Sequence, residues 1–223
     1  MRIYCMSDMH GHLKEFEDAL SLVTDSLSDS DTYLILLGDY IHMGPQSREV
    51  IDRIIELQDK YGSDHVTAIL GNHEESCIMG LTGVDDSDDL KAGDEKYISW
   101  MRGLPRYITR GNTIFTHAGI DEEAGDWWQV GTSDHIFTSK YPAQTGEIPD
   151  LDMKVVAGHI GTASISGDPS FHGIFYDGAS HYYIDGTVTE SGQIPVLMVD
   201  TSEDRYYSVS SDGIKEVKAY DKH

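Results

Sequence analysis

Five short motifs of this chain contain the residue types that bind metal ions. In chain order, they are Asp8-Met9-His10-Gly11, Gly38-Asp39-Tyr40, Gly71-Asn72-His73-Glu74, His117-Ala118-Gly119 and Gly158-His159. Carboxylate, imidazole and amide-oxygen ligands together suit divalent first-row metals. The Asp39 side chain is also short enough to bridge two such ions. The motifs therefore predict a site for divalent metal ions.

Each motif follows an apolar run that is typical of a β-strand. The first three runs occupy 2–7, 32–37 and 66–70. Between them, apolar residues recur with helical spacing over 13–27 and 47–61. Alternating strands and helices predict a parallel sheet, and such sheets bind ligands at the carboxyl ends of their strands. Two later runs end near His117 and His159, so we expect all five motifs at one site.

The second half of the chain predicts further short strands. A helix is expected over 95–101, and Gly111-Asn112 predicts a hairpin between 106–110 and 113–117. The remaining strands are expected near 154–157, 171–176, 182–184, 195–199 and 205–209. The sequence shows no internal repeat and no long linker. We therefore expect one α/β domain over 1–223, with two packed sheets and helices outside.

The composition excludes several classes of partner. The 223 residues include 39 acidic and 16 basic side chains, which gives a formal net charge of −23. Nucleic-acid polymers and anionic membranes attract positively charged surfaces, so neither is expected as a partner. No apolar stretch approaches the roughly 20 residues that span a membrane. Two cysteines, Cys5 and Cys77, make no disulfide framework, which predicts a reducing, cytoplasmic location.

The five motifs resemble those of the calcineurin-like metallophosphoesterases. The greatest likeness is to bacterial relatives in the branch of serine/threonine phosphoprotein phosphatases and diadenosine-polyphosphate hydrolases. The resemblance runs from residue 1 to about residue 209 and includes Ile184-Asp185-Gly186. It implies a four-layer α/β/β/α sandwich built from two mixed sheets. It also implies two divalent metal ions, and manganese, iron and zinc all suit these ligands.

The resemblance also implies a role for each polar position. Asp8 and His10 would bind the first ion, and Asp39 would bridge the two ions. The second ion would be bound by Asn72, His117 and His159. A hydroxide shared by the two ions would attack phosphorus in line. His73 matches the residue that protonates the leaving group, a role that suits an imidazole.

The second motif departs from the family pattern Gly-Asp-x-x-Asp-Arg-Gly. His42 stands where the family has an aspartate that bonds the proton-donating histidine. Met43 stands where the family has an arginine that binds phosphate, and no arginine lies between His117 and Arg205. The arginines that remain as substitutes are Arg48, Arg106 and Arg110. The ligand set is therefore complete, whereas the expected guanidinium contact to phosphate is missing.

Three functions fit these residues. The first is a dinuclear-metal phosphatase that hydrolyses phosphomonoesters, either phosphoproteins or small metabolites, with Asn72, His73 and His42 at the substrate. The second is a phosphodiesterase or dinucleoside-polyphosphate hydrolase, for which loss of the arginine matters less. The third is a pseudoenzyme that binds metal and phosphate without turnover. The acidic segment 80–96 is expected at the rim of the site, and no oligomeric state follows from the sequence.

Overall fold

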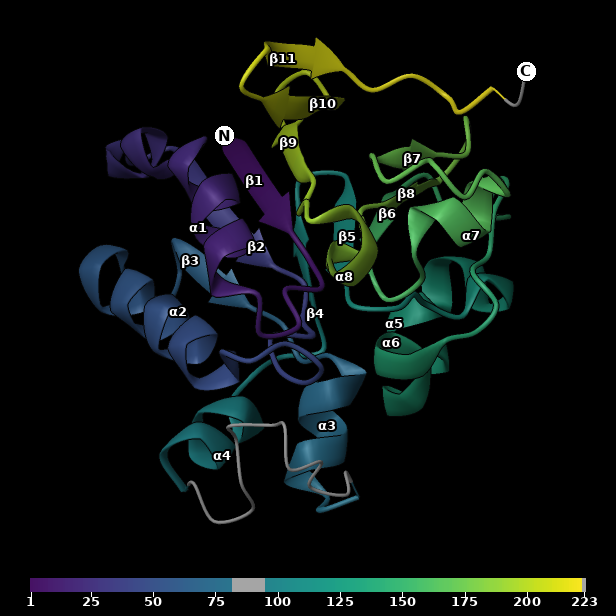
Figure 1. Ribbon diagram of the computed structural model, residues 1–223. Helices are drawn as coiled ribbons and strands as arrows, with labels where there is room; N and C mark the ends of the chain where they lie inside the picture. The colour runs from purple at the N-terminus through teal and green to yellow at the C-terminus, as the bar shows by residue number, and fades with distance from the viewer. Residues whose placement is uncertain (82–94, 222–223) are drawn as a thin grey trace.

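Two β-sheets lie face to face in a computed structural model that describes residues 1–81 and 95–221 (Figure 1). The first sheet contains β1 (Arg2–Met6), β2 (Thr32–Leu36), β3 (Val66–Ala68), β9 (Val196–Asp200), β10 (Arg205–Ser210) and β11 (Gly213–Glu216). The second contains β4 (Tyr107–Arg110), β5 (Thr113–Thr116), β6 (Lys154–Ala157), β7 (Phe175–Tyr176) and β8 (His181–Tyr183). Their strand orders are β11-β10-β9-β1-β2-β3 and β4-β5-β6-β8-β7.

Both sheets are mixed, as expected. In the first sheet, β1 and β3 pair with β2 in parallel, and β9, β10 and β11 extend it in antiparallel fashion. In the second sheet, β5, β6 and β8 are parallel neighbours, and the edge strands β4 and β7 are antiparallel. The carboxyl ends of β1, β2 and β3 therefore meet at one edge of the first sheet, where their motifs follow.

Helices cover the outer faces of both sheets. Those beside the first sheet or below it in Figure 1 are α1 (Leu13–Ser21), the 3₁₀ helix η1 (Thr24–Ser28), α2 (Ser47–Tyr61), α3 (Asn72–Ile78) and α4 (Glu95–Arg102). The later ones are the 3₁₀ helix η2 (Glu122–Trp127), α5 (Trp128–Gly131), α6 (Asp134–Ser139), α7 (Thr162–Ser166) and α8 (Val188–Ser191). Within the described residues, every helix is too short or too polar to cross a membrane.

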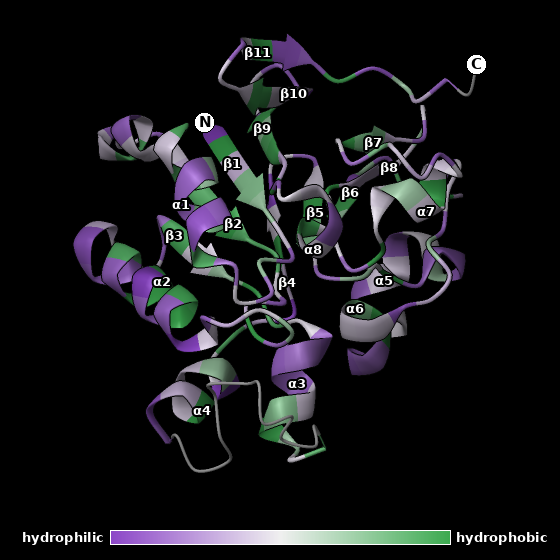
Figure 2. Cartoon of the chain, in the orientation of Figure 1, coloured by the Kyte–Doolittle hydropathy of each residue, from purple (hydrophilic) through white to green (hydrophobic). Residues whose placement is uncertain are grey.

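The layers follow from the two-residue period of the strands. On β1, Cys5 faces the core between the sheets, whereas the next residue, Met6, packs under α1 and α2. On β5, Phe115 joins the same central core, and Ile114 packs against Phe137 of α6 on the opposite face. In Figure 2, hydrophobic residues run along much of β2 and β9, and α1 and α2 show both kinds of residue. The architecture is therefore a four-layer α/β/β/α sandwich, which confirms the expected fold class.

Several expected elements have different bounds. The helix expected over 13–27 is α1 followed by η1, and at the break Thr24 Oγ1 donates to the carbonyl of Leu20. The strand expected over 171–176 is limited to β7, because Gly173 precedes it and a glycine weakens a strand. The sequence did not predict the short helices after η2. Each has four to six residues, which is too short for a periodic pattern of apolar residues to be recognised. Most of the acidic segment 80–96 lies outside the described residues.

Candidate metal centre

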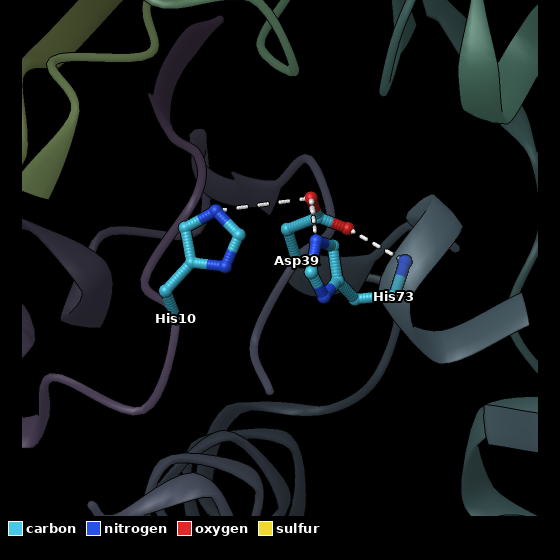
Figure 3. Close-up of side chains that lie close together, drawn as sticks. All are labelled: His10, Asp39 and His73. Atoms are coloured by element: carbon cyan, nitrogen blue, oxygen red, sulfur yellow. Dashed lines mark hydrogen bonds and ion pairs between the residues drawn. The ribbon is translucent and has the colours of Figure 1, made fainter. Parts of the chain in front are cut away.

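The loops that follow β1, β2, β5 and β6 converge on Asp39. Two groups of potential ligands share this residue, and within each group the ligand atoms lie within 4.8 Å of one another. The groups are His10, Asp39 and His73, and Asp39, His117 and His159. Figure 3 shows the first group, in which one oxygen of the Asp39 carboxylate is joined by dashed lines to a ring nitrogen of His10 and of His73. The structure thus brings together motifs from both sheets, as the strand ends predicted.

Asp39 is buried at the centre of this arrangement. Its Oδ1 atom accepts a hydrogen bond of 3.1 Å from the backbone N–H of His73. Its Oδ2 atom lies 3.4 Å from His117 Nε2, 3.8 Å from His73 Nε2 and 3.9 Å from His10 Nε2. Burial opposes ionisation of Asp39, but the charges of His117, His73 and His10 and the hydrogen bond from His117 together outweigh it and lower the pKa of the carboxyl. The Asp39 carboxylate is therefore anionic and directs one oxygen towards three imidazoles.

Asp8 supplies a second buried carboxylate. Its Oδ2 accepts a 3.0 Å hydrogen bond from the backbone N–H of His159. Its Oδ1 is buried, has no hydrogen-bond partner among the described residues and lies 3.8 Å from His10 Nε2. Burial, opposed in part by His117, raises the pKa of Asp8 to about 6. A buried oxygen without a hydrogen-bond donor fits a cation, whose charge would favour the ionised form.

Asn72 and His117 form the other side of the centre. His117 Nδ1 lies 2.8 Å from the carbonyl of Leu37, so this nitrogen carries a proton and donates it. His117 Nε2 then faces Asn72 Oδ1 at 3.0 Å. Burial lowers the pKa of His117, but Asp39 reverses the shift and raises it to about 10. A proton therefore occupies Nε2 between acceptors, and a metal ion fits the same position once that proton leaves.

His159 completes this group. Its ring lies edge-on to that of His117, with 5.0 Å between the ring centroids. Burial, assisted by the positive charge of His117, lowers the pKa of His159 to about 4. The imidazole is therefore neutral near pH 7, which is the form that binds metal ions.

The loops that carry these ligands are strained. Asp8, His10, Asp39 and His159 have φ values of 57°, 47°, 55° and 66°, although none is a glycine. Such conformations cost about 1–3 kcal/mol each and are concentrated at functional sites. Gly158 allows the close approach, because a Cβ atom there would lie 2.2 Å from Asp8 Oδ2. The strain indicates that the fold holds these side chains in place for a function.

Glu74 holds the Asp39 loop, a role that the sequence analysis missed. Its buried carboxylate accepts two hydrogen bonds at Oε2, from the N–H groups of Asp39 at 2.8 Å and Gly71 at 3.1 Å. At Oε1 it accepts two more, from Tyr40 at 2.8 Å and Ile41 at 3.2 Å. Glu74 is the third residue of α3 and also bonds the residue before that helix. The signal that could have revealed it is an acidic residue three positions after Gly71, a spacing that is typical of the first turn of a helix.

His42 lies against His73, and Met43 points away from the protein interior. The Nδ1 atoms of His42 and His73 are 3.1 Å apart, so the loop after β2 brings the two imidazoles into contact. The backbone N–H of His42 donates to Ser47 Oγ at 3.1 Å. The next side chain, Met43, is 75% exposed. The position that an arginine would occupy in the family is therefore apolar and open to solvent.

The candidate arginines lie in three different settings. Arg106 forms an ion pair with Glu75, with 2.6 Å between Nη2 and Oε1, and Nη2 is also 3.5 Å from Asp134. Arg110 is the backbone neighbour of Thr113 across β4 and β5, at the start of β5. The ligand His117 follows the opposite end of that strand. Arg48 belongs to the first turn of α2. Of the three, Arg106 contacts α3, the helix that contains Asn72 and His73, and its charge is balanced by Glu75.

The chain matches known proteins at three levels. The family model of the calcineurin-like phosphoesterases matches residues 1–190. A symmetrical bis(5'-nucleosyl)-tetraphosphatase of Buchnera aphidicola is 30% identical over 133 residues, which are 55% of this chain and 46% of that protein. The chain thus spans about half the length of the curated relatives that it matches.

Two solved structures show the same fold at low identity. One is a cold-active protein-tyrosine phosphatase of a Shewanella species, with a TM-score of 0.67, 16% identity and coverage of 97% of this chain and 80% of that one. The other is described as a putative diadenosine tetraphosphatase, with a TM-score of 0.60, 20% identity and coverage of 99% and 95%. These similarities support the fold, and the arrangement around Asp39 is the basis for the chemistry.

Proposed function

Because the chain belongs to the calcineurin-like phosphoesterase family, we propose that it hydrolyses a dinucleoside polyphosphate with two divalent metal ions. The observation that carries the proposal is the position of Asp39 Oδ2, 3.4–3.9 Å from three imidazole nitrogens that belong to two ligand groups. One shared carboxylate between two groups is the arrangement that a pair of ions requires.

The residues present fit two ions. Asp8, with its unpartnered buried oxygen, and His10 would hold the first ion together with Asp39. The second ion would be held by Asp39, Asn72, His117 and His159. Manganese, iron and zinc all suit such a mixture of nitrogen and oxygen ligands. When bound, the two ions supply Lewis acidity at the phosphoryl oxygens and lower the pKa of water.

The protein supplies the remaining functions of the site. Leu37 fixes the tautomer of His117, and Glu74 fixes the backbone of Asp39, so both ligands are oriented before a substrate arrives. His73 Nε2 faces the same Asp39 oxygen as the ligands, which supports the proposed role of His73 as the donor to the leaving oxygen. His42 supports His73 from the opposite side of its ring.

The choice of substrate rests on the relatives and on Met43. The curated relatives that match this chain are named as symmetrical tetraphosphatases of dinucleosides. An exposed Met43 offers no charge to a dianionic phosphomonoester, whereas an internal phosphate of a dinucleotide carries one negative charge and needs less compensation. We therefore place this substrate before the phosphomonoesters that the sequence favoured first. A complete ligand set also argues against a pseudoenzyme.

A substrate panel tests the proposal. The purified chain is stripped with a chelator, reloaded with Mn²⁺, Fe²⁺ or Zn²⁺, and assayed with diadenosine tetraphosphate, an aryl phosphodiester, an aryl phosphomonoester and a phosphopeptide. We expect the highest kcat/KM for the dinucleotide, and no turnover after chelation. A phosphomonoester or phosphopeptide turned over more than about tenfold better would overturn the substrate assignment.

A further inference from the structure

A pocket beside the first sheet has no role in the function proposed above. It has a volume of about 490 Å³, which lies within the range of small-molecule sites. Its walls come from α1, from the segments 172–174 and 192–196, and from 208–211 at the end of β10. None of the proposed metal ligands is among these wall residues. The pocket is therefore a second candidate site on the described part of the chain.

The register of the strands places this pocket at the same edge of the first sheet as the metal centre. β9 runs antiparallel to β1, and Leu197 pairs with Cys5, three residues before Asp8. Val196, a wall residue of the pocket, precedes Leu197 and pairs with Val209 of β10. In Figure 1, the start of β9 accordingly lies beside the arrowhead of β1. Because β10 is the second strand from β1, the wall on β10 lies about 10 Å from β1.

The charges on the walls exclude an anionic ligand. The wall residues include Glu15, Asp18 and four serines, but no lysine or arginine. Asp18 is paired with Lys14, with 2.7 Å between Oδ2 and Nζ. Glu15 lies 3.7 Å from His12 Nδ1, which is too far for a hydrogen bond, so its carboxylate is able to accept from a ligand. The walls therefore repel phosphate and suit a neutral group that carries hydroxyl donors.

The buried part of the pocket is apolar. The three buried wall residues are Ala19, Ile194 and Val196, whereas polar wall residues such as Gln193 and Ser210 are exposed. A nucleoside has the same two parts, because its base has apolar faces and its ribose carries hydroxyl groups. A simple sugar would leave the apolar surface without a matching partner. The pocket thus matches the neutral end of a nucleotide better than its phosphates.

We propose that this pocket binds one nucleoside of the substrate while the metal centre holds the polyphosphate. Glu15 accepts hydrogen bonds from the ribose hydroxyls, and Ala19, Ile194 and Val196 contact the base. The negative walls keep the polyphosphate out of the pocket, so the two parts of the substrate are sorted by charge. This inference rests on the proposed function, which supplies a substrate with a neutral nucleoside at each end of an anionic chain.

Nuclear magnetic resonance tests the pocket without turnover. The full chain is labelled with ¹⁵N, loaded with Zn²⁺ and titrated with adenosine, a probe that carries no phosphate. We expect saturable shifts of the backbone N–H signals of Ala19 and Ile194, and weaker binding in Glu15→Ala, in which alanine preserves the helix. Inorganic phosphate should leave these signals in place. Shifts with putrescine but not with adenosine would indicate an amine site and overturn the proposal, and so would the absence of any shift with adenosine.

Kinetics provide a second readout. Ser21→Phe, at the exposed end of α1, adds a ring at the pocket wall, and we expect kcat/KM for diadenosine tetraphosphate to fall by about tenfold relative to that for the aryl phosphodiester. Ser28→Phe, at the exposed end of η1 and outside the pocket walls, is the matched control and should leave this ratio unchanged. An unchanged ratio in both Ser21→Phe and Glu15→Ala would overturn the pocket assignment even if the wild type prefers the dinucleotide. A wild-type protein that binds adenosine in this pocket but ignores dinucleotides would contradict only the proposed function.

Discussion

Asp39 and Glu74 are joined through the backbone, because the N–H of Asp39 donates to Glu74 Oε2 at 2.8 Å. Glu74 is fully buried and accepts three further backbone hydrogen bonds from Tyr40, Ile41 and Gly71. A fully buried carboxylate therefore sets the position of the central ligand. The strained φ of Asp39 persists because this network holds the loop from the side of α3.

Replacement of Glu74 by glutamine removes half of these acceptors. One oxygen becomes an amide that faces N–H donors, so we expect Glu74→Gln to lower the free energy of unfolding by about 2–3 kcal/mol. Urea unfolding at neutral pH measures the change. Glu49→Gln, at an exposed position of α2, is the matched control and should change stability little. Equal stability of Glu74→Gln and wild type would show that the loop does not depend on this carboxylate.

Asp39→Asn tests the shared ligand. The amide is neutral and binds cations more weakly than a carboxylate, so we expect loss of most bound metal and of nearly all hydrolysis. Metal analysis after dialysis gives the stoichiometry, with two ions per chain expected for the wild type. Asp18→Asn, on the exposed face of α1, removes the same charge elsewhere and should retain both ions. An Asp39→Asn variant that retains metal and activity would contradict the dinuclear assignment.

A buried histidine that belongs to neither ligand group predicts a pH dependence of stability. His181 Nδ1 lies 2.8 Å from Asp177 and Nε2 lies 3.3 Å from Glu122, which also bonds Lys140. Burial lowers the pKa of His181, but the bonds to Asp177 and Glu122 reverse this effect and raise it. Burial opposes ionisation of both carboxyls. The hydrogen bonds from His181 and Lys140 together outweigh it at Glu122, and the hydrogen bonds from His181 and from nearby backbone N–H groups together outweigh it at Asp177, so each pKa is lowered.

The signs of these shifts define a window. Because the pKa of His181 is raised in the folded state, its protonated form stabilises the fold fully below about pH 6.5. This stabilisation is lost as the pH rises through the folded pKa. Because the pKa values of Asp177 and Glu122 are lowered in the folded state, their ionised forms stabilise the fold above about pH 4.3. This stabilisation is lost as the pH falls through the folded pKa values. We therefore expect the stability difference between wild type and His181→Gln to be largest near pH 5.5, at about 3 kcal/mol, and smaller at pH 9. Urea unfolding at both pH values measures it, and a pH-independent difference would contradict the charged network.

The sequence predicted the parts of the fold that have strong periodicity. The helix expected over 47–61 has these bounds in α2, since a full set of apolar residues marks one face. The strands that precede Asp8 and Asp39 were expected because their runs are almost entirely apolar, as in a sheet covered on both faces. Each apolar run is followed by an aspartate with a positive φ, a backbone conformation that does not occur within a β-strand, so the strand ends there.

Other features depend on contacts between distant residues. The role of Glu74 arises mainly from bonds to a loop more than 30 positions earlier, and the local pattern accounts only for its bond to Gly71 at the start of α3. The contact between His42 and His73 was expected only through the family resemblance. The ion pair between Arg106 and Glu75 likewise joins two distant residues, so it could not be predicted from a local pattern. Because Glu75 balances the charge of Arg106, this arginine is a weaker candidate for phosphate binding.

Met43→Arg tests the missing guanidinium. Met43 is 75% exposed beside His42, and arginine is also unbranched at Cβ, so we expect the variant to fold. A bidentate contact to a dianionic phosphate should raise kcat/KM for phosphomonoesters by about tenfold, with a smaller gain for diesters, whose phosphate carries less charge. Met79→Arg, at another exposed methionine, adds the same charge after α3. An equal gain in both variants would indicate a general effect of net charge, and no gain in metal-loaded Met43→Arg would show that the phosphate lies out of reach of this loop.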